Sequence, residues 1–177
     1  MGYSHTYCYN SADPQFQAAW PRMTADTRTI IEAVLHLDLG VTGPYGEIEP
    51  TITDDVIGFN GLRCRGEDRD PLLITAAPPD EPQDSSGPEP GFRASHCETG
   101  RNPYDLAVAA VLLRCHRLAP QAFRIDSSGR WNGEWIYGAH HSQLGPTPPF
   151  GPSARMLNAT LFADAPDESP FTRRFPW

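Results

Sequence analysis

Lysine is absent from this sequence, and all 14 of its basic residues are arginine. Lysine solvates a protein surface as well as arginine does, so this absence points to the base composition of the source genome rather than to a mechanism. A run of about 18 apolar residues is also absent, and we therefore expect no membrane span. The N-terminus has no basic stretch followed by an apolar one, so we expect no secretory signal peptide.

The charge balance and the missing motifs narrow the expected function further. The formal net charge of −8 argues against a general affinity for nucleic acid, because phosphate contacts dominate such binding. Without a signal peptide we expect a cytoplasmic protein whose four cysteines are reduced. The chain also lacks a phosphate-binding P-loop, a dinucleotide glycine fingerprint and a Gly-x-Ser-x-Gly elbow, and we expect no cofactor.

Local patterns predict a small set of helices and strands. Asp13 and Pro14 are typical of a helix start, and Pro21 predicts either a kink in that helix or a later start near residue 22. The patterns indicate helices ending near 36 and spanning 103–118, strands at 2–9, 56–62, 71–76 and 122–126, and a short helix near 131–137. This order predicts an α+β fold, with a mostly antiparallel sheet and two or three helices packed on one face.

The distribution of proline and glycine divides the chain into a core and an arm. We expect a single core domain over residues 1–144 that contains a mobile loop at 78–91, where five prolines fall within 14 residues. From residue 145 onward, proline and glycine recur without a sustained period. We therefore expect an irregular C-terminal arm over 145–177, whose last aromatic residues need a surface on which to dock.

The densest group of polar side chains lies at residues 96–105, directly before the most apolar helix. The N-terminus of that helix would favour an anion and would lower the pKa of a nearby thiol. Cys97 is therefore a candidate nucleophile, with His5 as its base and either Asn60 or Asp105 to orient the imidazole. A purely structural interpretation stands beside this one: Asn102 caps the helix, Tyr104 packs in the core and Cys97 is buried.

A ligand-binding site is the leading hypothesis. Tyr3 and His5 share one face of the first predicted strand, which would form an aromatic wall. We expect a small anionic, nucleotide-like ligand, with Arg101 on the anion and Tyr3 or Tyr104 stacked on a ring. The expected ligand-binding residues are Tyr3, His5, Asn60, Thr99, Arg101 and Tyr104.

Two other functions remain open. One is an interaction or inhibitor protein that uses its acidic surface and aromatic C-terminal arm to bind a partner protein. The other is a Cys97-dependent hydrolase or transferase. A metal site built from His5, Cys8, His96 and Cys97 is not expected, because zinc sites use paired ligand spacings that these residues lack.

Several short motifs resemble those of a family of small uncharacterised proteins from bacteriophages and bacteria. That family has an N-terminal Gly-Tyr-Thr-His, a central Phe-Asn-Gly, a Phe-Cys-Lys-Thr-x-x-x-Pro-Tyr-Asp loop and a late Ser-Asp-Gly turn. The matching positions are Gly2, Tyr3, Ser4 and His5, then Phe59, Asn60 and Gly61, then Cys97, Thr99, Pro103, Tyr104 and Asp105, then Ser127 and Gly129. Glu98 replaces the lysine, His96 the phenylalanine and Ser128 the aspartate. The resemblance implies a shared fold and a phage or mobile-element context, but no activity. In that context, the partner of an interaction protein would be a host or phage protein.

Overall fold

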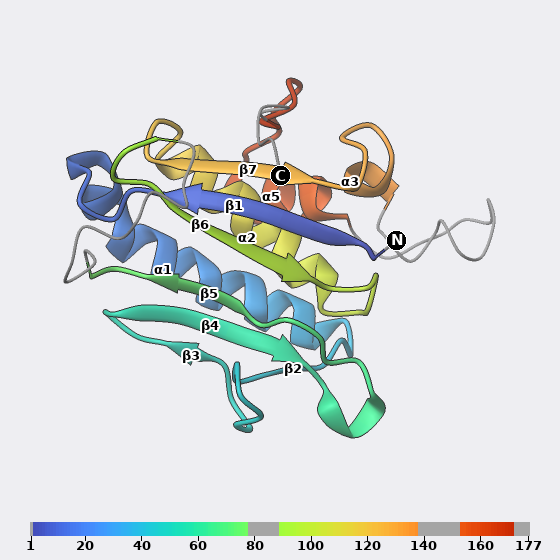
Figure 1. Cartoon of the computed structure of the whole chain (residues 1–177). Coiled ribbons are helices and arrows are strands. Elements are labelled where there is room, and N and C mark those ends of the chain that lie inside the picture. The colour runs from blue at the N-terminus through green and yellow to red at the C-terminus, as the bar shows by residue number, and fades with distance from the viewer. Residues whose placement is uncertain (1, 78–88, 138–152, 172–177) are drawn as a thin grey trace.

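The computed structural model describes residues 2–77, 89–137 and 153–171 of the chain (Figure 1). Most of the predicted loop at 78–91 and the predicted boundary at 144/145 lie outside these ranges. The described residues form one α+β domain with antiparallel sheets, as the order of the predicted elements indicates. No helix among them is both long and apolar enough to cross a membrane.

The elements alternate irregularly along the chain. In order they are β1 (Ser4–Tyr9), α1 (Pro14–His36), β2 (Val41–Thr42), β3 (Thr51–Ile52), β4 (Val56–Gly61), the 3-10 turn η1 (Arg63–Arg65), β5 (Leu72–Thr75), β6 (Arg93–Glu98), α2 (Asp105–Leu118), β7 (Phe123–Ser127), α3 (Glu134–Tyr137) and α5 (Ala154–Phe162). Strand β6 was not predicted, since residues 96–98 were assigned to the polar segment before α2 and residues 93–95 to no element. Only Cys97 in that strand is buried, so the strand has no apolar period.

The strands form two sheets rather than the single sheet that the sequence suggests. One sheet has the order β6-β1-β7, and the other has the order β2-β4-β3, with β5 also paired to β4. All of these pairings are antiparallel. Figure 1 shows the two sheets side by side, with β5 next to β6, and helices α1 and α2 behind them.

Side chains join the two sheets along the seam between β5 and β6. The Tyr7 hydroxyl donates to the Leu73 carbonyl at 2.8 Å and accepts from the Leu73 amide at 3.3 Å. The Tyr9 hydroxyl accepts from the Thr75 amide at 3.1 Å. These hydroxyls thus satisfy backbone groups of β5 that a neighbouring strand would otherwise pair.

Helix α1 begins where the sequence predicts. The Asp13 carboxylate accepts from the Gln15 amide at 2.7 Å, and Pro14 occupies the first turn, where its missing N–H costs nothing. The helix continues through Pro21 without ending. One face of α1 is buried in the core, through Phe16, Trp20, Met23, Ile30 and Val34.

Helix α2 is the centre of the molecule, since it packs on α1, on α5 and on β7. Its side chains from Ala107 to Leu113 are buried on every side of the helix, as its apolar sequence predicts. The expected cap from Asn102 is wrong, since the start of α2 has no side-chain cap. The Asn102 side-chain amide donates instead to the Glu67 carbonyl at 2.7 Å.

The expectation of an irregular arm from residue 145 is wrong for residues 154–162, which form helix α5. Ser153 caps this helix by accepting from the Met156 amide at 3.2 Å. The buried side-chain amide of Asn158 donates to the Ala110 carbonyl of α2 at 3.1 Å. A short helix between proline-rich flanks gives too little periodicity to be recognised, and these tertiary contacts stabilise it.

Candidate functional site

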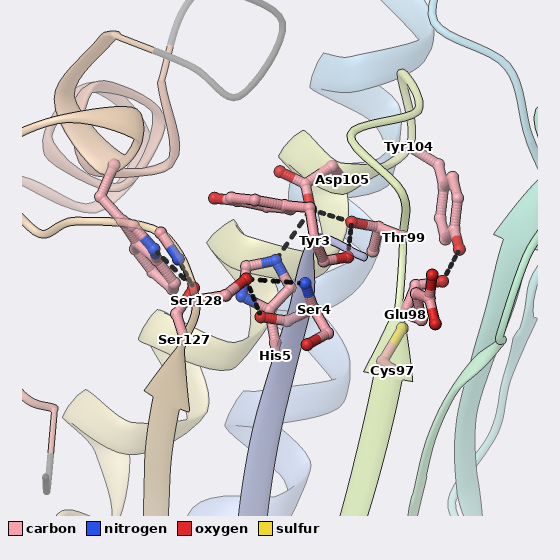
Figure 2. Close-up of polar contacts among 12 residues, drawn as sticks. Tyr3, Ser4, His5, Cys97, Glu98, Thr99, Tyr104, Asp105, Ser127 and Ser128 are labelled. Carbon is pink, nitrogen blue, oxygen red and sulfur yellow. Dashed lines mark hydrogen bonds and ion pairs between the residues drawn. The ribbon is translucent and has the colours of Figure 1, made fainter. Parts of the chain in front are cut away.

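Antiparallel pairing brings the start of β1 next to the ends of β6 and β7. Ser4 is opposite Glu98 of β6, and His5 is opposite Ser127 of β7. Helix α2 begins seven residues after β6, so its first residue, Asp105, reaches the same end of the sheet. Figure 2 shows the side chains of these elements converging there.

A buried histidine and a buried aspartate form the centre of this cluster. His5 Nε2 is 2.8 Å from Asp105 Oδ1, and the Thr99 hydroxyl donates to the same oxygen at 2.5 Å (Figure 2). His5 has no exposed surface, and Asp105 is 4% exposed. The other ring nitrogen, His5 Nδ1, is buried and has no hydrogen-bond partner among the described residues. An unpaired nitrogen at this position is unusual, because most buried polar atoms have a hydrogen-bond partner.

Tyr3 separates this buried pair from a partly exposed arginine. The Tyr3 and His5 rings meet edge to face, with centroids 5.3 Å apart. The Arg101 guanidinium carbon lies 4.6 Å from the Tyr3 ring centroid, a cation–π distance. Arg101 Nη2 is 3.8 Å from Glu134 Oε1, which is a loose ion pair, and its Nε is buried without a described partner.

The backbone around Arg101 is strained. Gly100 and Arg101 both adopt left-handed conformations, with φ of 60° and 64°. This conformation suits glycine, but it costs an arginine on the order of 1 kcal/mol. The amides of Thr99 and Gly100 both donate to the Tyr3 carbonyl at 3.0 Å, which fixes this turn to the start of β1.

Ser127 completes the cluster from the side of β7. Its hydroxyl oxygen accepts from the Gly129 amide at 3.0 Å and from Trp135 Nε1 at 3.3 Å. Trp135 also packs edge to face on His5, with ring centroids 5.6 Å apart. A Cβ at Gly129 would overlap the Tyr3 hydroxyl, so this turn approaches Tyr3 closely because residue 129 has no side chain.

Four of the six predicted ligand residues gather here, and two do not. Tyr3, His5, Thr99 and Arg101 belong to the cluster described above. Asn60 instead bonds to the backbone of residues 61 and 69, and the buried Tyr104 hydroxyl donates to the Asp70 carbonyl at 3.0 Å. Figure 2 shows Tyr104 on the opposite side of β6 from His5. The six residues therefore do not line one common pocket.

Neither tyrosine offers a free ring face for stacking. Tyr3 is 3% exposed and Tyr104 is fully buried. Burial also raises the pKa of both phenols above the usual value, with the Asp105 charge raising each further. Both hydroxyls are therefore protonated at neutral pH and act as neutral hydrogen-bonding groups.

Cys97 has the properties of a structural cysteine. Its thiol is buried and donates to the Asp70 carbonyl at 3.2 Å. Burial, together with the negative charges of Asp105 and Asp70, raises the pKa of this thiol well above its ordinary value. The lowered thiol pKa expected from the helix N-terminus is therefore wrong, because the Asp105 carboxylate occupies that position. A nucleophilic thiol needs the opposite electrostatic environment.

Ser127, Glu134 and Trp135 belong to the site but were not among the predicted site residues, whereas Asp105 was named as one of two residues that could orient the His5 imidazole, and its carboxylate bonds to His5. The signal that could have found Ser127 is the Ser-Ser-Gly turn after a predicted strand. Within the described part of the chain, no group of three or more His, Cys, Asp or Glu side chains is arranged to hold a metal ion.

No protein-family model, no curated protein and no solved structure matches the chain. The geometry of the cluster around Tyr3, His5 and Arg101 is therefore the basis for assigning a function.

Proposed function

We propose that the protein binds a small anionic ligand through Arg101. The observation that carries this proposal is the state of the guanidinium: it is stacked on Tyr3, partly exposed, and only loosely paired with Glu134 at 3.8 Å. A guanidinium presents its N–H groups as a planar fork that matches a carboxylate or a phosphate. An anion that accepts from this fork would replace a weak internal contact with a strong one.

Two further features support a ligand at this end of the molecule. The buried nitrogens without described partners include Arg101 Nε and His5 Nδ1, and both of these side chains pack on the Tyr3 ring. Backbone strain at Arg101 is the second feature, because strained residues concentrate where a side chain must be held for binding.

The position of the ring of a nucleotide-like ligand differs from the one expected from the sequence. Since Tyr3 and Tyr104 are buried, a ring would stack on the outer face of the Arg101 guanidinium rather than on a tyrosine. The phosphate or carboxylate would lie in the plane of that guanidinium. We place this function in the cytoplasm, in the phage or mobile-element context that the family resemblance implies.

The test is a thermal-stability screen of the protein against nucleoside mono-, di- and triphosphates and inorganic phosphate. A ligand at 100 times its Kd should stabilise the parent protein by about 2.7 kcal/mol. Arg101→Ala and Arg101→Gly should both lose this effect, and the glycine variant also relieves the backbone strain. Arg65→Ala, which removes an exposed arginine of η1, should respond as the parent does. Equal ligand stabilisation in the parent and Arg101→Ala would show that Arg101 does not bind the anion.

One specific observation favours the second candidate, an interaction protein. Tyr45 is 75% exposed and Ile48 is 90% exposed, both in the turn between β2 and β3. Exposed apolar side chains of this size mark protein-binding surfaces when they lie together. A screen in which no anion stabilises the parent protein would favour this candidate over the first.

A further inference from the structure

The hydrogen bonds of Asp105 fix the form of the His5 ring. The Asp105 carboxylate accepts from the Thr99 hydroxyl. Because a carboxylate has no proton to donate, His5 Nε2 is the donor in its bond to the same oxygen and carries the ring proton. In a neutral imidazole the second nitrogen then carries a lone pair. His5 Nδ1 is therefore a buried base held in one orientation, with no donor among the described residues.

The strand register places Ser127 beside that base. Because the Ser128 amide donates to the Ser4 carbonyl at 3.0 Å, residues 4 and 128 form a hydrogen-bonded pair. His5 and Ser127 are then a non-hydrogen-bonded pair, in which the Cα atoms are about 4.5 Å apart and the side chains lie closest. Figure 2 shows Ser127 and Asp105 on different sides of His5.

The surroundings of the Ser127 hydroxyl suit a nucleophile. Its oxygen accepts from the Gly129 amide and from Trp135 Nε1, so neither of these bonds uses the hydroxyl proton. When the Ser127 side chain turns toward His5, these two donors become free to bind the carbonyl oxygen of a substrate, where negative charge develops. Ser127 is partly exposed while His5 and Asp105 are buried, so a substrate reaches the serine first. Ser127 Oγ and His5 Nδ1 are not bonded in this structure, and a rotation of the Ser127 side chain toward His5 would join them.

We propose that Ser127, His5 and Asp105 form a hydrolytic triad that cleaves esters carrying an anionic group. In the first step, Ser127 Oγ attacks the ester carbonyl and His5 Nδ1 takes the hydroxyl proton. The carbon–oxygen bond to the alcohol then breaks, and His5 returns the proton to the departing alcohol. Water attacks the acyl-serine in the same way and releases the acid. The inference rests on the proposed function, since Arg101 would hold the anionic group of the substrate.

The experiment treats the folded protein with an uncharged fluorophosphonate and locates the label by mass spectrometry. Attack by Ser127 Oγ forms an oxygen–phosphorus bond and expels fluoride, while His5 takes the proton. We expect one label, on Ser127, and none in Ser127→Ala. Asp105→Asn keeps the side-chain shape but no longer fixes the His5 tautomer, and it should slow labelling by about 10²-fold or more. Ser128→Ala, which alters the neighbouring exposed serine, should label at the parent rate.

A parent protein that is folded by circular dichroism and acquires no label on Ser127 would overturn the triad. Labelling of Asp105→Asn at the parent rate would also overturn it, because a merely exposed serine does not depend on Asp105. A second assay compares p-nitrophenyl esters with and without a carboxylate. Loss of the preference for the anionic ester in Arg101→Ala links the triad to anion binding. A labelled Ser127 with no such preference in the parent would reject the role of Arg101 and leave the triad in place.

Discussion

At the scale of single residues, burial determines the reactivity of the cysteines. Cys8, Cys97 and Cys115 are buried, whereas Cys64 lies exposed in η1. Burial raises the pKa of Cys8 to about 11 and raises the pKa values of Cys97 and Cys115 above the ordinary range. Only a thiolate reacts quickly as a nucleophile, so three of the four thiols are protected by both access and protonation.

We therefore predict a single alkylation by iodoacetamide near neutral pH, on Cys64. Mass spectrometry of the peptides from the folded protein measures this, and the unfolded protein, in which all four thiols react, is the control. Rapid modification of Cys97 in the folded state would contradict the buried position described here. It would also restore the thiol-dependent enzyme as a candidate function.

The residues of the site differ in how well the sequence reveals them. His5 and Arg101 stand out because each lies in a local cluster of polar or aromatic residues. Ser127 and Trp135 do not, since strand pairing brings Ser127 of β7 next to His5, and tertiary packing brings Trp135 of α3 onto the His5 ring. Asn60 was assigned to the site because of its polar side chain, which instead satisfies nearby backbone groups.

At the scale of elements, the seam between β5 and β6 is the least conventional feature. Tyr7 and Tyr9 of β1 reach past β6 and bond to the backbone of β5. No local pattern predicts such a contact, because a tyrosine on an aromatic strand face is normally interpreted as a core residue. For the same reason the sequence predicts β1, β4, β5 and β7 but does not predict that they divide between two sheets.

We predict that Tyr7→Phe destabilises the protein by about 1–3 kcal/mol, because the Leu73 amide and carbonyl lose the partner that satisfies them. Chemical denaturation measures the change, and hydrogen exchange should show faster exchange at the Leu73 amide. Tyr137→Phe is the matched control, since Tyr137 is 60% exposed, and its effect should stay within about 0.5 kcal/mol. Equal stability of the two variants would show that the Tyr7 hydroxyl contributes nothing to the seam.

At the scale of the whole molecule, the two sheets share one hydrophobic core. Buried side chains of β1, β4, β5 and β7 belong to the same cluster as those of α1 and α2. A core that spans both sheets should unfold cooperatively rather than sheet by sheet. The α+β class could be predicted from the order of elements, but this shared core depends on contacts between residues far apart in the sequence.

We predict that the slowest-exchanging amides of β4 and of β7 report the same free energy of opening. Native-state hydrogen exchange at increasing denaturant concentration measures both. A plateau for β4 several kcal/mol below that for β7 would mean that its sheet opens by itself. Such a result would contradict the coupling that we assign to the seam.

The position of β1 between β6 and β7 also has a consequence for protein synthesis. The earliest of the described strands to be synthesised is the middle strand of its sheet, and its partner β7 ends at Ser127. At about 5–20 residues per second, the ribosome needs roughly 6–24 seconds to make the 118 residues from Asn10 to Ser127. During that time the edge of β1 that pairs with β7 has no partner, whereas β6 is available earlier for the other edge. The nascent chain is therefore a natural client for chaperones, and truncated products that stop before β7 should be degraded rather than accumulate.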